Sequence, residues 1–141
     1  LSRCGNVQQL EAWMGRLPSL KELDLSESGV VDLSALNDMA HGSLPFLEIL
    51  SLKGCRSVQK LEAWIARLPS LSAFDLSSSG VVDLCALNGM APGSLSQLQT
   101  LNLSDCRMLE HLPWRLCELD LDEFVVSGSD GILHYDFLLR S

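Results

Sequence analysis

The chain has 141 residues, with 10 Lys and Arg against 18 Asp and Glu, which gives a formal net charge of -8 and a pI near 4.7. Hydrophobic residues make up 47% and charged residues 20% of the sequence, a globular composition that excludes an extended disordered chain. The acidic balance argues against general nucleic-acid binding. No apolar run reaches the roughly 18 residues that insertion into a membrane requires. At this length we expect a single domain.

The cysteines are odd in number and lack CxxC spacing, which disfavours both a disulfide framework and a zinc site. They are Cys4, Cys55, Cys85, Cys106 and Cys117. This cysteine usage suits a reducing compartment, so we expect an intracellular, cytoplasmic protein. No basic segment followed by an apolar one marks a secretory signal. The sequence has no initiator Met and opens within the pattern described next, and we therefore expect a fragment of a longer protein.

An internal repeat dominates the sequence. Shifting the chain against itself by 51 residues aligns residues 1–61 with 52–112, and 36 of the 61 pairs are identical. Within each copy, leucines recur in the pattern LxxLxL. In chain order, a truncated copy ends at Leu1 and five full motifs follow, at 20–25, 47–52, 71–76, 98–103 and 116–121. Their first leucines are 27, 24, 27 and 18 residues apart.

The motif predicts one strand and one short helical segment in each repeat. Leucines alternate with other residues within LxL, so they face inward from a short strand. After the second strand, Val58, Leu61, Ile65 and Leu68 are spaced by 3 and 4 residues, which suits one or two helical turns. Because such a unit does not bury its apolar edge alone, the units must stack. The sequence predicts an α/β solenoid with a curved parallel sheet on the concave side and helices or 3₁₀ turns on the convex side.

The motif LxxLxLxx(N/C)xL, with a period of roughly 20 to 29 residues, is similar to that of the leucine-rich repeat family. The resemblance covers residues 1–124, where repeats of 24 and 27 residues alternate, and Cys4, Cys55 and Cys106 fall in its Asn/Cys column as buried structural thiols. The segment LNLSDCRMLEHLP resembles repeats of plant immune receptors, whereas the SGVVDL units resemble repeats of kinetoplastid protists. Residues 125–141 lose the pattern, and we expect them to form a C-terminal cap.

The residues that alternate with the strand leucines are predicted to face the concave side. With the truncated copy included, this face holds nine acidic and two basic residues, which is half of the acidic residues in the chain. Charge of one sign on a rigid sheet favours a basic partner. The candidate partner-binding residues are Glu22, Asp24, Glu27, Ile49, Lys53, Asp75, Thr100, Asn102, Asp105, Glu118, Asp120 and Asp122.

Comparison of the two 51-residue copies supports the same face. Only two of ten concave pairs are identical, Asp24/Asp75 and Ser26/Ser77, against 34 of 51 pairs elsewhere. Drift at exposed positions is one explanation, although drift would have changed the convex surface equally. We interpret the difference as a binding surface that changed on a constant scaffold.

The sequence therefore predicts a non-enzymatic module that binds a protein or peptide with a basic patch on its concave sheet. It contains no nucleophile elbow, P-loop or HExxH motif, so we expect no enzyme activity, no cofactor and no metal site. Two alternatives stay open: a structural segment of a larger repeat protein or assembly, and the ligand-sensing domain of an immune or signalling receptor.

Overall fold

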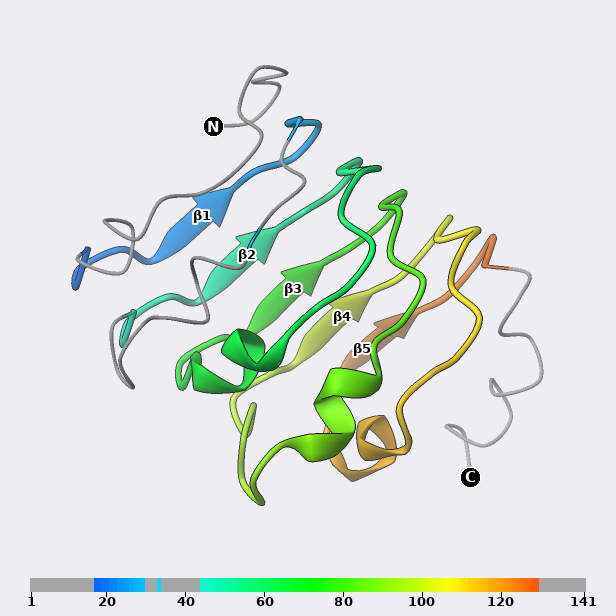
Figure 1. Ribbon diagram of the computed structural model, residues 1–141. Coiled ribbons are helices and arrows are strands. Elements are labelled where there is room, and N and C mark those ends of the chain that lie inside the picture. The colour runs from blue at the N-terminus through cyan, green and yellow to red at the C-terminus, as the bar shows by residue number, and fades with distance from the viewer. Residues whose placement is uncertain (1–16, 30–32, 34–43, 130–141) are drawn as a thin grey trace.

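Five short parallel strands form the sheet of this protein, whose computed structural model describes residues 17–29, 33 and 44–129. The strands are β1 (Glu22–Asp24), β2 (Ile49–Ser51), β3 (Ala73–Asp75), β4 (Thr100–Asn102) and β5 (Glu123–Val125). They lie side by side in chain order, and each pairs with the next in parallel (Figure 1). The chain therefore completes one coil for each strand, as the repeat predicted.

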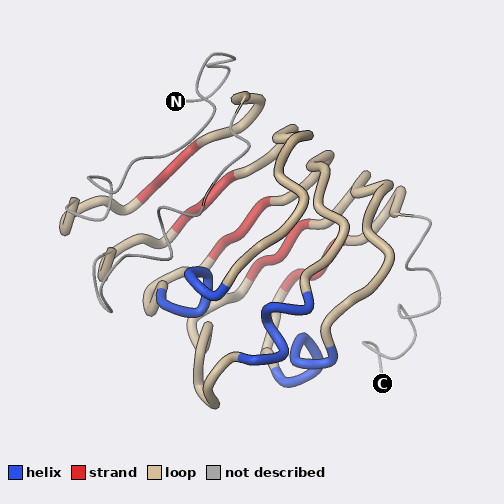
Figure 2. The backbone as a smooth tube through the Cα atoms, viewed as in Figure 1, coloured by secondary structure: helices blue, strands red, loops and turns tan. Residues whose placement is uncertain are grey.

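The return segments of the coils carry three 3₁₀ helices in the described part of the chain. These are η3 (Ala63–Arg67), η4 (Cys85–Gly89) and η5 (Trp114–Glu118). They lie together on the side away from the sheet, and loops form most of the remaining chain (Figure 2). The predicted solenoid is thus confirmed, with the sheet on the concave side and 3₁₀ turns on the convex side.

Every coil contributes leucines to one continuous core. The leucines that directly follow β1 to β4 all have an exposed fraction of 0%: Leu25, Leu52, Leu76 and Leu103. The middle residue of each of these strands also points inward and is buried: Leu23, Leu50, Phe74 and Leu101. Full burial of such a side chain contributes about 1.5–3 kcal/mol, so stacking of the coils supplies most of the stability.

All five strands lead into a turn with the same backbone conformation. Its last residue has a positive φ in every repeat: Glu27 (54°), Gly54 (72°), Ser78 (56°), Asp105 (56°) and Gly128 (77°). Glycine adopts this left-handed region without cost, whereas a residue with a Cβ is disfavoured there by about 1 kcal/mol. The three non-glycine turns are therefore sites of local strain.

The fifth strand shows that one prediction from the leucine pattern was wrong. The fifth motif starts at Leu121 and not at Leu116, and Phe124 and Val126 take the places of leucines. The corrected start lies 23 residues after the fourth, close to the spacings of 24 and 27 elsewhere. A spacing of 18 residues is too short, because a full coil of strand, turn and helix takes at least about 20 residues.

Two predicted segments lie wholly or largely outside the described residues. These are the truncated first copy with Cys4, and the C-terminal cap at 125–141, of which the structure describes 125–129. Within 125–129 the repeat geometry continues. Ser129 is buried, and its hydroxyl donates a hydrogen bond of 2.6 Å to the carbonyl of Leu103 in the preceding coil.

Candidate partner-binding face

The strand register arranges the exposed residues of the sheet in rows across the concave face. What we call the first row contains the first residue of each strand: Glu22, Ile49, Ala73, Thr100 and Glu123. The second row contains the third residue of each strand: Asp24, Ser51, Asp75, Asn102 and Val125. Adjacent strands lie about 4.8 Å apart, so neighbours in a row are within reach of each other and of one ligand.

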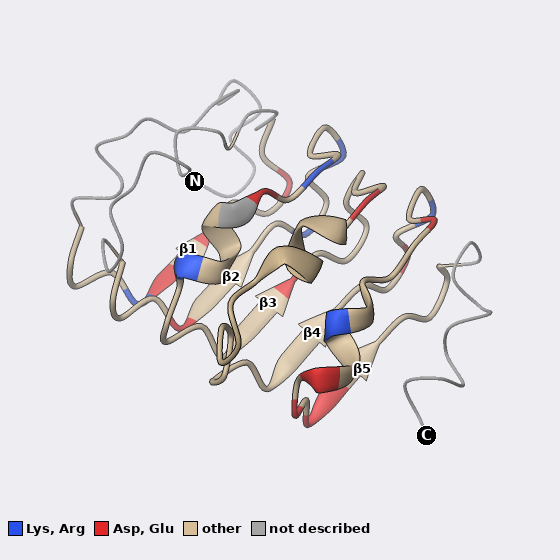
Figure 3. Cartoon of the chain, turned by 60° about the horizontal axis from the view of Figure 1, so that its bottom comes forward, with Lys and Arg blue, Asp and Glu red and all other residues tan. Residues whose placement is uncertain are grey.

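The first row has a weakly polar centre between two acidic ends. Ile49 is 41% exposed although it is a large apolar residue, and Ala73 and Thr100 beside it are partly exposed. Glu22 and Glu123 are exposed on the outermost strands. Figure 3 shows acidic residues on β1, β3 and β5, whereas β2 and β4 carry none.

The second row has a structural role that the sequence analysis missed. In β1, Asp24 Oδ1 accepts hydrogen bonds from the Ser26 backbone N–H (2.9 Å) and hydroxyl (2.5 Å). In β3, Asp75 Oδ1 accepts the same two bonds from Ser77, at 2.8 and 2.6 Å. These bonds hold the turn that ends each strand. They explain why the two concave pairs that form them are the two that stayed identical between the copies.

The same arrangement occurs with an amide in β4, where Asn102 Oδ1 accepts bonds from the Ser104 N–H (3.0 Å) and hydroxyl (2.6 Å). In these three turns an acceptor oxygen is sufficient, and a negative charge is not needed. In β1, the hydrogen bonds from the Ser26 hydroxyl and backbone N–H stabilise the charged carboxylate and lower the pKa of Asp24.

Three further candidate residues lie in the turns at the ends of the strands. Glu27, Lys53 and Asp105 are all exposed there. The Glu27 N–H donates a 2.7 Å hydrogen bond to the Lys53 carbonyl, so the backbones of these two turns are directly linked. The structure thus brings nine of the twelve candidate residues to the strands of the sheet and the turns that follow them.

The other three candidates do not lie on the concave strands, because the fifth motif was misplaced. Glu118 is the last residue of η5, on the convex side. Asp120 and Asp122 lie in the segment that leads into β5, and Asp122 directly precedes Glu123 at the rim of the first row. The prediction that all three point from the fifth strand was wrong.

The corrected concave face is less acidic than predicted but remains negative. Its described positions include six acidic residues, Glu22, Asp24, Glu27, Asp75, Asp105 and Glu123, and the one basic residue among them is Lys53.

A shallow depression adjoins the first row at the start of the strands. It has a volume of about 340 Å³ and polar walls: Glu48, Ser70, Ser72, Gln97 and Gln99. Two of its hydroxyls are already used, since Ser70 Oγ donates to the Pro45 carbonyl (2.5 Å) and Ser72 Oγ to the Glu48 carbonyl (3.1 Å). No sequence pattern indicates this depression, because its walls come from positions before the strands in separate repeats.

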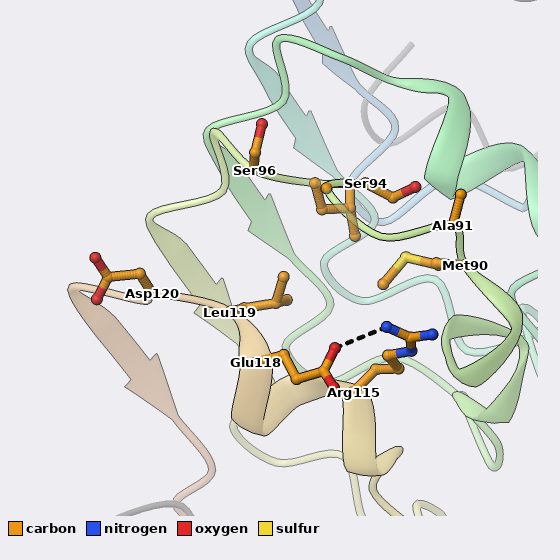
Figure 4. A pocket seen from close by; sticks show the side chains of 10 residues that line it. Met90, Ala91, Ser94, Ser96, Arg115, Glu118, Leu119 and Asp120 are labelled. Carbon is orange, nitrogen blue, oxygen red and sulfur yellow. Dashed lines mark hydrogen bonds and ion pairs between the residues drawn. The ribbon is translucent and has the colours of Figure 1, made fainter.

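A second pocket, of about 230 Å³, lies on the convex side between η5 and the loop that follows η4 (Figure 4). Arg115 and Glu118 line it and form an ion pair of 2.7 Å with each other. The Arg115 guanidinium also lies 4.7 Å from the ring centroid of Trp114, which is 56% exposed. Arg115, the one basic residue of the pocket lining, is thus already paired, which makes this pocket the weaker candidate for an anionic ligand.

Cysteine and serine alternate in the buried column of the repeat: Ser28, Cys55, Ser79, Cys106 and Ser129. Cys55 and Cys106 have an exposed fraction of 0%, and each Sγ donates a 3.0 Å hydrogen bond to a carbonyl of an earlier coil. Burial raises the pKa of both thiols. The predicted structural role of these two cysteines is confirmed. Among the described residues there is no group of three His, Cys, Asp or Glu side chains placed to hold a metal ion.

Comparison with known proteins agrees with this architecture. The sequence profile of the family described as Leucine Rich Repeat matches residues 97–122, which include β4 and η5. No curated protein matches the chain. Among solved structures, an internalin (inlF) from Listeria monocytogenes is similar, with a TM-score of 0.50 and 19% sequence identity over 83% of this chain and 32% of that chain. The chain thus spans about a third of the length of that protein, and the likeness concerns the fold.

The repeat, the open parallel sheet, the profile match and this likeness define a leucine-rich repeat solenoid. The profile match covers one repeat of the chain, and the likeness to the internalin concerns the solenoid fold. Leucine-rich repeats in general serve in protein–protein interaction. In the part of the chain that the structure describes, the helices are too short and polar to cross a membrane.

Proposed function

We propose that this chain is a non-enzymatic interaction module that binds a basic protein or peptide segment on the concave face of its sheet. The observation that carries the proposal is the first row, where an exposed isoleucine on the second of five paired strands lies between the exposed glutamates of the two outermost strands. An apolar contact near the centre of a patch with charged groups at its rim is the usual anatomy of a protein-binding surface.

The apolar part of the row supplies binding energy. Ile49 lies on β2, which is paired on both sides. Its backbone is therefore already ordered before a partner binds, so binding loses no backbone entropy there. Covering this side chain removes apolar area from water at about 25 cal/mol for each Å². Ala73 is small, which leaves space above the sheet beside Ile49 for a partner side chain.

The charged part of the row supplies orientation and partner choice. Asp24 and Asp75 use a carboxylate oxygen in their turns, so Glu22 and Glu123 are the strand carboxylates available to a partner. A negative face attracts basic partners and repels acidic ones, which increases the association rate and the specificity more than the affinity.

Selection from a displayed random peptide library tests this proposal. Wild-type protein should enrich peptides that contain Lys or Arg. The variant Glu22→Lys/Glu123→Lys should lose this enrichment, because both ends of the row then repel basic residues. Circular dichroism establishes that the variants fold like the wild type.

The matched control is Glu110→Lys/Asp120→Lys, which changes the net charge equally at exposed positions off the concave strands. It should enrich the same peptides as the wild type at 0.15 M salt, where charges are screened beyond about 8 Å. Loss of enrichment in both variants, or in neither, would show that the concave row is not the binding site.

A further inference from the structure

We infer that the first row recognises an extended segment with two basic residues about six positions apart and a small apolar residue two positions after the first of them, so that all three side chains face the sheet. This inference rests on the proposed function and specifies the partner of the same face. The segment crosses the strands, with one basic side chain at Glu22, the apolar side chain over Ile49 and Ala73, and the other basic side chain at Glu123.

The spacing follows from the register of the sheet. Glu22 and Glu123 occupy the same position on β1 and β5, which are separated by four strand-to-strand steps. Each step is about 4.8 Å, so the two carboxylates lie about 19 Å apart along the row. An extended chain advances about 3.3 Å for each residue and covers this length in about six residues. An α-helix needs about thirteen residues for the same length.

The polar depression beside the row favours the extended form of the partner. Gln97 and Gln99 present amide groups there, and these groups suit the free N–H and C=O groups of an extended backbone. A helix already pairs these backbone groups internally and gains less from such a wall. The depression and the row together therefore match an extended segment.

The two ends of the row differ in negative charge. Asp122 is exposed directly before Glu123, whereas Lys21 is exposed directly before Glu22. The β5 end thus carries two negative charges, and the β1 end carries a carboxylate with a lysine next to it in sequence. The basic residue at the β5 end should contribute more to binding than the one at the β1 end.

Two capped heptapeptides of identical composition test the spacing. The spaced peptide is acetyl-Lys-Ser-Val-Ser-Ser-Ser-Lys-amide, and the compact isomer is acetyl-Ser-Ser-Lys-Val-Lys-Ser-Ser-amide. Their net charges are equal, so a difference in affinity reports geometry alone. Titration followed by NMR should give a dissociation constant about two- to fivefold lower for the spaced peptide, the effect of one exposed ion pair.

Single neutral substitutions then test the roles of the two ends. Glu123→Gln should lower the affinity for the spaced peptide about two- to fivefold, and Glu22→Gln should lower it by less. The control Glu110→Gln should leave this affinity unchanged. Equal affinities of the two isomers, or the absence of saturable binding by either, would overturn the inference. If library selection still depended on the concave row in that case, the proposed function would stand and only the spacing would fail.

Discussion

At the scale of single residues, the repeat imposes one backbone conformation on five different side chains. The last residue of the strand turn has a positive φ whether it is Gly54, Gly128, Ser78, Asp105 or Glu27. The stacked coils enforce this conformation, because the neighbouring turns are hydrogen-bonded to one another. Ser78, for example, donates a 2.9 Å bond from its N–H to the Ser104 carbonyl. The packing of the solenoid thus overrides the preference of these non-glycine residues for a negative φ.

This strain predicts opposite effects of the same substitution at two serines. Ser78→Gly should raise the free energy of unfolding by about 0.5–1 kcal/mol, because glycine adopts φ of 56° without the Cβ penalty. Ser96→Gly, at an exposed loop position without positive φ, should lower it by about 0.5–1 kcal/mol through the greater entropy of the unfolded chain. Urea denaturation measures both. A decrease at Ser78 as large as that at Ser96 would contradict the account of the turn.

We expect Asp24 to make the free energy of unfolding decrease in acid. Its hydrogen bonds from Ser26 lower its pKa in the folded state, so the folded protein binds fewer protons than the unfolded chain. The contribution is complete above the unfolded pKa near 3.9 and is lost as the pH falls through the folded pKa. Asp24→Asn keeps the acceptor oxygen, as Asn102 does, and should show a smaller drop in the free energy of unfolding below about pH 4.

NMR titration of the Asp24 carboxyl checks the cause directly. Ser26→Ala removes the hydroxyl that makes the largest contribution, and the pKa of Asp24 should move back toward its ordinary value. A pKa that stays unchanged in this variant would show that the Ser26 hydroxyl is not responsible.

At the scale of elements, the sequence predicted four of the five strands because leucine marks their inward positions without ambiguity. It failed for β5, where the motif uses Phe124 and Val126 and where η5 contributes a competing set of leucines. The requirement that a coil needs about 20 residues would have corrected the error. The turn role of Asp24 and Asp75 was also missed, since a carboxylate on a strand gives no sign of which hydrogen bonds it accepts.

The buried column of cysteine and serine predicts a clear division of thiol reactivity. Cys55 and Cys106 are fully buried, and burial raises their pKa, so both should resist a water-soluble thiol reagent in the folded protein. Cys85 and Cys117 are exposed and should react. Labelling in a Cys4→Ser background, followed by peptide mass spectrometry, gives the order of modification.

Urea should make the two buried thiols reactive at the same midpoint as global unfolding, because they lie in the shared core of stacked coils. Modification of Cys55 or Cys106 in native buffer at the rate of Cys117 would show that the column is open to solvent. Within the exposed pair, the Asp83 hydrogen bond raises the pKa of Cys85, so Asp83→Asn should increase its labelling rate.

At the scale of the whole molecule, the solenoid separates stability from recognition. The leucine columns and the turn hydrogen bonds maintain the coils, and these residues recur between the two copies. The first row contributes little to the core, and its residues differ at every pair compared within the described strands, Glu22/Ala73 and Ile49/Thr100. A fixed scaffold therefore presents a surface whose chemistry is free to change.

If the scaffold and the recognition surface are separate, a ligand should contact the first row and not the convex side. The most direct measurement is an NMR titration of the isotope-labelled protein with the spaced Lys-Val-Lys heptapeptide. Chemical shift changes should concentrate on the first row and on the depression beside it, at Glu22, Ile49, Ala73, Gln99 and Glu123, while η3 and η4 stay unchanged. Changes centred on the convex pocket of Arg115 and Glu118, with none on the first row, would contradict this prediction.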